Sequence, residues 1–214
     1  MPEKPKHEAL NPNSFNAERD SRYHYDEIAR NFDHSWDGFL SSFFKRFIVK
    51  TLDFEIHSTI LDIGCANGKL LEMLNEKKAI IGTGIDISPK MVRVASELYP
   101  SFTFKSGSAQ QLPLGSESFD VITCSASFHH FPDPIAFLKE VKGFLKKDGR
   151  LVIAEIRIPV ITRIYNRVIT DHSYEGDVQV YSPKELQTLF FETGWVIQKK
   201  KISRQIQYYE LTSK

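Results

Sequence analysis

Two aspartates stand near the ends of two apolar segments, 24 residues apart, and could bind a charged ligand. Asp62 lies in TILDI (59–63) and is followed by Gly64 and Gly68, which let the backbone approach a ligand closely. The Asp62 carboxylate would repel a pyrophosphate but suits a cation. Asp86, in AIIGTGIDI (79–87), can accept hydrogen bonds from both ribose hydroxyls of a nucleoside. Together they favour a nucleoside that carries positive charge and no phosphate, as S-adenosylmethionine does.

The same turn argues against a dinucleotide cofactor. A G-x-G-x-x-G fingerprint that starts at Gly64 requires glycine at positions 66 and 69. Those positions hold Ala66 and Lys69. An NAD(P)-dependent oxidoreductase is therefore a disfavoured alternative.

Alternating strand and helix signals predict the sheet that positions these aspartates. Apolar runs at 59–63, 79–87, 102–106, 119–125 and 150–156 are separated by helical segments. Three helices are expected to begin at Ser88-Pro89, Asp133-Pro134 and Ser182-Pro183, where a capping side chain precedes proline. Two final strands after Gly194 are expected to pair antiparallel. The pattern predicts an α/β fold with a doubly wound, mostly parallel, Rossmann-like sheet of seven strands, the last one antiparallel, and helices on both faces.

Composition excludes several functional classes. The 214 residues carry a net charge of +1, which gives no electrostatic reason to expect a nucleic-acid or membrane partner. Two cysteines are too few for a disulfide framework or a thiolate metal site, and we expect no metal. No apolar run approaches the roughly 20 residues of a membrane span. We expect a cytoplasmic protein without a signal peptide.

The chain is expected to consist of a short N-terminal arm followed by one domain. Residues 1–20 are polar and are expected to form a flexible arm, and residues 21–214 a single domain. Large apolar side chains recur at helical spacing at Phe32, Trp36, Phe39, Leu40, Phe43 and Phe47. Two interpretations stay open for this aromatic face: it packs in the core, or residues 21–50 form a helical lid with Tyr23, Tyr25 and Phe32 near the ligand pocket.

Several ordered motifs resemble the class I S-adenosylmethionine-dependent methyltransferases. They are ILDIGCANGKL (60–70), GIDIS (84–88), SGSAQQLPLGSESFDVITCSASFHHFPDP (106–134) and LKKDGRLVIAE (145–155). YDEIARNFD (25–33) and YSPKELQTLFFETGW (181–195) fit the same pattern, which is similar to the small-molecule branch that includes ubiquinone and menaquinone biosynthesis enzymes. The resemblance implies in-line methyl transfer from S-adenosylmethionine to a small-molecule acceptor by a monomer or homodimer, with S-adenosylhomocysteine as product.

The resemblance also assigns cofactor-binding positions around four strand ends. They are Asp62, Gly64, Cys65, Ala66 and Gly68; Asp86, Ile87, Ser88 and Met91; Gly107, Ser108, Ala109 and Gln110; and Ser125, Ala126, Ser127 and His130. Two residues depart from the family pattern. Ala66 replaces the middle glycine, and Ser108 replaces an acid that accepts from the adenine amino group. A neutral hydroxyl accepts more weakly than a carboxylate. A cofactor-binding or regulatory protein without catalytic activity therefore stays open.

Two histidines follow the fourth strand, where the methyl group should emerge. His129 and His130 could accept a proton from the acceptor, since histidine titrates near neutrality. The alternative is that they only line the pocket, because methyl transfer does not require a base. In this branch an insertion such as 157–180 caps the acceptor site, which places Tyr165 there. The sequence does not choose between oxygen, nitrogen and carbon acceptors.

Overall fold

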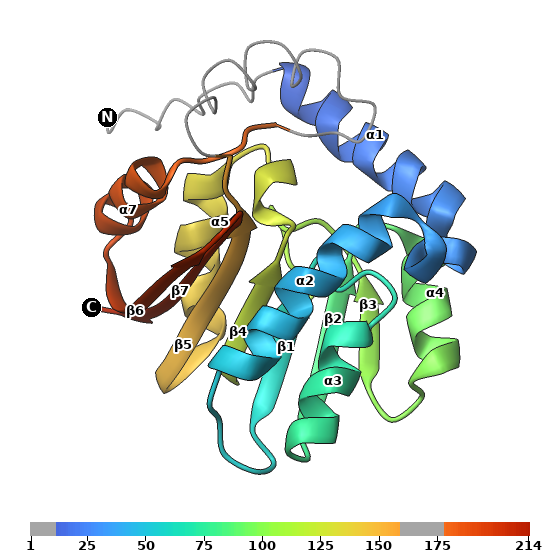
Figure 1. Cartoon of the computed structure of the whole chain (residues 1–214), viewed down its shortest axis with the longest axis horizontal. Coiled ribbons are helices and arrows are strands. Elements are labelled where there is room, and N and C mark those ends of the chain that lie inside the picture. The colour runs from blue at the N-terminus through green and yellow to red at the C-terminus, as the bar shows by residue number, and fades with distance from the viewer. Residues whose placement is uncertain (1–11, 159–177) are drawn as a thin grey trace, which may run out of the picture.

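The computed structural model describes residues 12–158 and 178–214, which form a seven-stranded sheet flanked by helices (Figure 1). The strand order is β3-β2-β1-β4-β5-β7-β6. The strands are β1 (Thr59–Ile63), β2 (Ile81–Asp86), β3 (Thr103–Ser106), β4 (Phe119–Ser125), β5 (Leu145–Ile156), β6 (Trp195–Ser203) and β7 (Ile206–Ser213). Strands β1 to β5 pair in parallel, whereas β7 runs antiparallel to both β5 and β6. The predicted doubly wound sheet is confirmed.

Three of the helices begin where the capping signals predict. They are α1 (Pro12–Ile28), η1 (Ala29–His34), α2 (Trp36–Thr51), α3 (Lys69–Lys77), α4 (Pro89–Leu98), η2 (Phe128–His130), α5 (Pro134–Glu140), η3 (Val141–Phe144) and α7 (Pro183–Glu192). The side chains of Ser88, Asp133 and Ser182 each accept a hydrogen bond from the backbone N–H three residues on. The three predicted helix starts are confirmed.

Successive side chains of the central strands enter two different cores. Ile60 and Val152 pack beneath α2 and α3, in a cluster with Ile48 and Leu70. Their chain neighbours on the same strands face the other side, where they pack with α5 and α7. This alternation follows from the two-residue period of a strand. The central strands are therefore buried on both faces of the sheet.

Helix α1 corrects the prediction for the N-terminal arm. Residues 12–20, which we expected to be part of a flexible arm, belong to this helix, and Pro12 is its first residue. Proline is favoured at the first helical position because its missing N–H needs no partner there. The helix crosses the upper end of the sheet in Figure 1 and contacts α4, η1 and η2.

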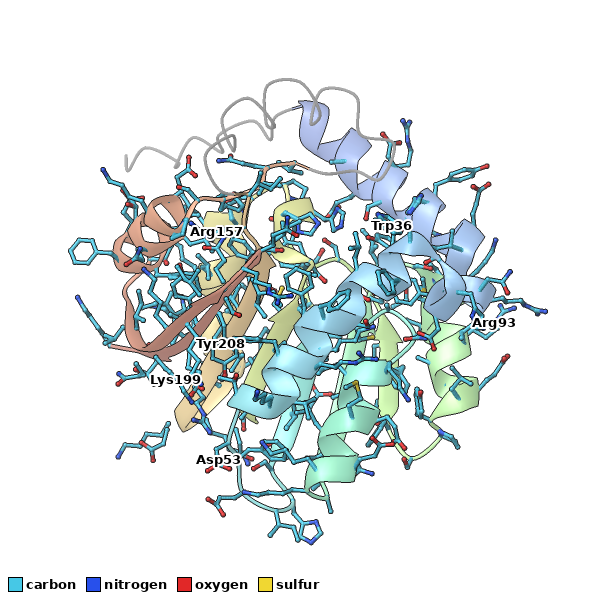
Figure 2. The ribbon with its side chains drawn as sticks, viewed as in Figure 1. Trp36, Asp53, Arg93, Arg157, Lys199 and Tyr208 are labelled. Atoms are coloured by element: carbon cyan, nitrogen blue, oxygen red, sulfur yellow. The ribbon has the colours of Figure 1, made fainter. Side chains whose placement is uncertain are left out.

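The aromatic face also differs from the prediction. The expected continuous helix is interrupted at Ser35, whose hydroxyl accepts from the Gly38 N–H at 3.1 Å and caps a new helix. This break shifts the buried face of α2 to residues such as Phe44 and Ile48. Trp36 (Figure 2) is 70% exposed, and Phe39 and Phe43 are exposed with it, so the core interpretation holds only for part of the face.

Two predicted features lie outside the described residues. Most of the insertion at 157–180, including Tyr165, falls there, as do residues 1–11 of the expected arm.

The capping box of α7 gives a stability prediction. Ser182 and Glu185 each accept from the other's backbone N–H. Ser182→Ala should lower the free energy of unfolding by about 1 kcal/mol, because one N–H of the first turn loses its acceptor. Urea denaturation measures the change. Ser203→Ala, at an exposed serine of strand β6, is the control. Equal midpoints for the two variants would contradict the cap.

Candidate functional site

A cavity opens at the carboxyl ends of the central strands, on the side covered by the N-terminal helices. Strand ends contribute Ile63, Asp86 and Ser125 to its wall. The turns that follow them add Gly64, Ala66, Ile87, Gly107, Ala109, Ala126, Ser127, His129 and His130. Helices α1 and α2 and the η1 segment close the other side with Glu18, Tyr25, Phe32, Leu40, Phe44 and Lys45. Two separate parts of the chain therefore build one site.

The turn after β1 forms a tight cradle. Gly64 has φ +72°, and a Cβ atom there would come within 2.3 Å of the Ser127 hydroxyl oxygen. Gly68 caps α3 with φ +79°. Ala66, between them, also has a positive φ of 47°. The left-handed region costs a non-glycine residue about 1–2 kcal/mol. The turn keeps this conformation although the middle position has a methyl group.

Asp86 is held at the end of β2 with its carboxylate on the cavity wall. One oxygen accepts from the Ala66 N–H at 2.8 Å and the other from the Ser88 N–H at 2.9 Å. Burial raises the pKa of Asp86 to about 6, while the two backbone N–H groups act in the opposite direction. An ionised carboxylate has about four acceptor positions. Each oxygen can therefore still accept from one hydroxyl group of a ligand.

Asp62 lies behind the cradle, among the residues that do not line the cavity. Its carboxylate accepts from the Thr123 hydroxyl at 2.7 Å. Burial raises the pKa of Asp62 to about 7, and the Thr123 hydrogen bond and the Lys45 charge oppose this. Asp62 therefore does not contact the cavity, and it can influence a ligand there only through its charge.

Lys45 is a site residue that the sequence does not reveal. It lies on the buried face of α2, 5.0 Å above the Phe32 ring centroid, and lines the cavity. Burial lowers the pKa of Lys45, whereas Asp62 and Asp33 raise it. The lysine inside the apolar run FFKRFIV could have indicated a buried cation. The predicted aromatic face, however, placed the buried side chains at other positions of this segment.

Glu18 is a second unpredicted site residue. The Ser108 hydroxyl donates a hydrogen bond to its carboxylate and accepts one from the Gln110 N–H at 2.9 Å. Glu18 comes from α1 and lines the cavity beside Gly107 and Ala109. A carboxylate from a residue 90 positions away in the chain thus lies beside Ser108.

The two histidines of η2 have different partners. The Nδ1 atom of His129 lies 2.8 Å from a carboxylate oxygen of Glu155. The Nε2 atom of His130 lies 3.1 Å from the hydroxyl of Tyr25. The two imidazole rings are 4.1 Å apart between centroids, and both line the cavity with Tyr25.

The predicted site residues thus divide into two groups. Those on the wall are Tyr25, Phe32, Gly64, Ala66, Asp86, Ile87, Gly107, Ala109, Ser125, Ala126, Ser127, His129 and His130. Those that do not line it are Asp62, Cys65, Gly68, Ser88, Met91, Ser108 and Gln110. Tyr23, which we expected near the pocket, is 67% exposed and also does not line it, because it points from α1 to solvent.

The described residues show no group of three or more His, Cys, Asp or Glu side chains that could hold a metal ion. Within residues 12–158 and 178–214, no helix has the length and apolar character needed to cross a membrane.

Comparison with known proteins identifies the core of the chain. Residues 61–153 match the methyltransferase domain family. This part of the chain is similar to a methyltransferase domain. A demethylmenaquinone methyltransferase of Thermotoga maritima is 34% identical over 110 residues, which are 51% of this chain and 48% of that protein. An uncharacterized methyltransferase of Bacillus subtilis, YcgJ, is 32% identical over 119 residues, or 52% and 46%.

Solved structures agree on the fold. The crystal structure of YcgJ from Bacillus subtilis has a TM-score of 0.64 at 27% identity and covers 75% of this chain and 72% of that one. A putative methyltransferase of Haloferax volcanii, in complex with the activator Trm112, has a TM-score of 0.74 at 22% identity and covers 86% and 80%. The match to the curated relatives spans about half of their length. These matches confirm the predicted resemblance to methyltransferases and the predicted fold.

The buried carboxyl of Asp62 gives a pH prediction. Its pKa is about 7 in the folded chain and ordinarily 3.8. Between these values the folded chain holds a proton that the unfolded chain releases, so the free energy of unfolding falls as pH rises, by about 1.4 kcal/mol per pH unit. Asp62→Asn should reduce this fall between pH 4.5 and 7, most clearly above pH 6, because Asp86 still contributes below its own pKa of about 6; urea denaturation of the ligand-free protein measures the change. Exposed Asp148→Asn should keep the wild-type fall. Parallel profiles for wild type and Asp62→Asn would contradict the assignment.

Proposed function

We propose that the chain binds S-adenosylmethionine in this cavity and transfers its methyl group to a small-molecule acceptor. The observation that carries the proposal is Asp86, a buried carboxylate on the cavity wall beside a glycine turn. It offers charged acceptors to a ribose, whereas the turn lacks the glycines of a dinucleotide site. The methyltransferase domain match and the relatives named as demethylmenaquinone methyltransferases support this function.

The adenosine end of the cofactor would lie between β2 and α1. Asp86 would accept from the two ribose hydroxyls with the acceptor positions that Ala66 and Ser88 leave open. Ile87 and Ala109 supply an apolar wall for the adenine. Glu18 would accept from the adenine amino group and so perform the role that Ser108 cannot perform alone. The weak adenine site expected from the sequence thus gains a charged acceptor.

The methionine end would lie over the cradle, near Lys45 and Asp62. The ammonium group of Lys45 lines the cavity and would pair with the carboxylate of the methionine. The negative charges of Asp62 and Asp86 favour the ammonium and sulfonium groups of the cofactor. Both carboxyls have raised pKa values, so a cationic ligand would bind best where they are ionised.

The methyl transfer requires that the acceptor nucleophile be aligned with the methyl group of the donor. A nucleophile of the acceptor attacks the methyl carbon, and S-adenosylhomocysteine leaves as an uncharged thioether. Because charge is neutralised in this step, the chain contributes mainly orientation and exclusion of water. Residues 21–50 would act as the lid, since Tyr25 and Phe32 close the cavity opposite the strand ends. The net charge of +1 gives no electrostatic reason to expect a nucleic-acid partner. We propose that the protein acts in the cytoplasm as a monomer or homodimer.

Removing the charge of Asp86 tests the ribose site. Asp86→Asn should weaken S-adenosylmethionine binding by about 1–3 kcal/mol, because two hydrogen bonds to a charged acceptor are lost. Isothermal titration calorimetry measures the affinity, with the exposed Asp148→Asn as control. Unchanged affinity would remove Asp86 from the site. Binding of NAD in place of S-adenosylmethionine would overturn the proposed function.

Glu18 gives a test of base recognition. Wild type should prefer S-adenosylhomocysteine to S-inosylhomocysteine, in which an oxygen replaces the amino group and repels the carboxylate. Glu18→Gln should reduce this preference about tenfold or more, since a hydrogen bond to a charged group contributes about 1.5–3 kcal/mol. Calorimetry with both ligands measures the ratio. Glu27→Gln, at an exposed glutamate of α1, should keep the wild-type ratio. An equal preference in all three proteins would place the adenine elsewhere.

A further inference from the structure

The outward side of α2 carries three exposed aromatic side chains that contact one another. Trp36 is 70% exposed, Phe39 51% and Phe43 45%. The ring centroids of Trp36 and Phe39 are 5.8 Å apart, and those of Phe39 and Phe43 are 5.1 Å apart. Single exposed apolar side chains are common on protein surfaces, whereas a contiguous group of large ones often marks a binding surface. Figure 1 shows α2 on the near side of the sheet, and Figure 2 labels Trp36 at the start of this helix.

Two exposed cations continue this row along the helix. Arg46 and Lys50 follow Phe43 at steps of three and four residues, the same steps that separate the three aromatic residues. Such steps place side chains on one face of a helix. Both cations are exposed. The five residues of this face are called the α2 stripe here: Trp36, Phe39, Phe43, Arg46 and Lys50.

Cations also gather around the C-terminal end of α2. Lys77 of α3 donates to two backbone carbonyl groups there, and Lys199 of β6, which also pairs with Glu210, donates to a third. The single acidic residue of α2 is Asp37, which is partly buried and pairs with His24 at 2.8 Å. The stripe and the end of its helix therefore favour an anionic partner.

The area of the aromatic side chains argues against a second copy of the chain as this partner. The three side chains together expose about 250–400 Å², since an aromatic side chain offers roughly 150–250 Å². A stable protein–protein interface buries about 800 Å² on each partner. A helix on a membrane surface needs less area, because it inserts only one apolar face about 5–10 Å into the boundary between headgroups and acyl chains.

We propose that the α2 stripe docks the protein on a membrane surface that contains anionic lipids. Trp36, Phe39 and Phe43 enter the boundary between headgroups and acyl chains. Arg46 and Lys50 contact the lipid phosphates, while their aliphatic stems stay on the apolar side. The helix lies on the bilayer and does not cross it. The net charge of +1, which gave no reason to expect a membrane partner, is an average over the whole chain and does not describe this face.

The α2 stripe is distinct from the cavity. Helix α2 lines the cavity with side chains that do not belong to the stripe: Asp37, Leu40, Ser41, Phe44 and Lys45. Substitutions in the stripe should therefore leave ligand binding in the cavity unchanged. Docking can be tested whether or not the cavity binds S-adenosylmethionine.

Tryptophan fluorescence of the full chain tests the contact directly, because the chain has two tryptophans and the other one, Trp195, is buried. Vesicles of equal parts phosphatidylcholine and phosphatidylglycerol should shift the Trp36 emission to shorter wavelength, and brominated acyl chains in them should quench it. Vesicles of phosphatidylcholine alone should quench it much less. Trp36→Phe should lose the quenching and still bind the anionic vesicles. No quenching with anionic vesicles, or equal quenching with both kinds, would overturn the proposal.

Vesicle flotation measures the aromatic part of the contact. Phe39→Ser combined with Phe43→Ser should lower the partition coefficient on the anionic vesicles about tenfold or more, because the apolar surface that enters the bilayer is removed. Circular dichroism checks that this variant is folded. Phe191→Ser, at a phenylalanine of α7 that is 73% exposed, is the matched control and should bind as wild type does. Equal partition of the double variant and the control would contradict docking by the stripe.

The same assay measures the cationic part. Arg46→Gln combined with Lys50→Gln should lower binding to the anionic vesicles about tenfold or more, since each cation near such a surface contributes about fivefold. The matched control is Lys90→Gln combined with Arg93→Gln, which removes two exposed cations of α4 (Figure 2) and should bind close to wild type. An equal loss in both double variants would reduce the attraction to overall charge and overturn the proposal. A dimer of wild type that forms without lipid and is lost in Phe39→Ser/Phe43→Ser would assign the stripe to a second copy and also overturn it.

Discussion

The burial of two carboxylates at neighbouring strand ends is the constraint that shapes this site. Taking Asp62 and Asp86 out of water is costly, and the chain offsets the cost with specific donors. Asp86 receives two backbone N–H groups from the turns around it, and Asp62 receives the Thr123 hydroxyl. Lys45 adds an opposing charge. Because burial raises the pKa of both carboxyls, a cationic ligand in the cavity would favour their ionised forms.

The sheet could be predicted from the sequence because its signals are local. The strand segments have nearly continuous apolar runs, and proline after a capping side chain marks three helix starts. The positions of Asp62 and Asp86 at strand ends follow from the same runs. The prediction of one continuous aromatic face was wrong, because Ser35 caps a new helix and so changes which side chains of α2 face the core. Helix α1 was missed because its polar first half resembles an arm.

The contacts that complete the site join residues far apart in the chain, and local patterns do not reveal them. Ser108 and Glu18 are 90 residues apart, and His129 and Glu155 are 26 apart. Lys45 reaches Asp62 only because α2 packs on the sheet. In each case the partner's identity depends on tertiary packing. Of the two departures from the family motif, one has a charged neighbour, because Glu18 of α1 places a carboxylate beside Ser108.

A crystal structure of the complex with S-adenosylhomocysteine tests the central claim most directly. The account predicts that the ribose hydroxyls lie within hydrogen-bonding distance of the Asp86 carboxylate, with the sulfur facing the side of the cavity that carries His129. Electron density for the nucleoside at any other position, or a cavity in which the Asp86 oxygens contact no ligand atom, would contradict it.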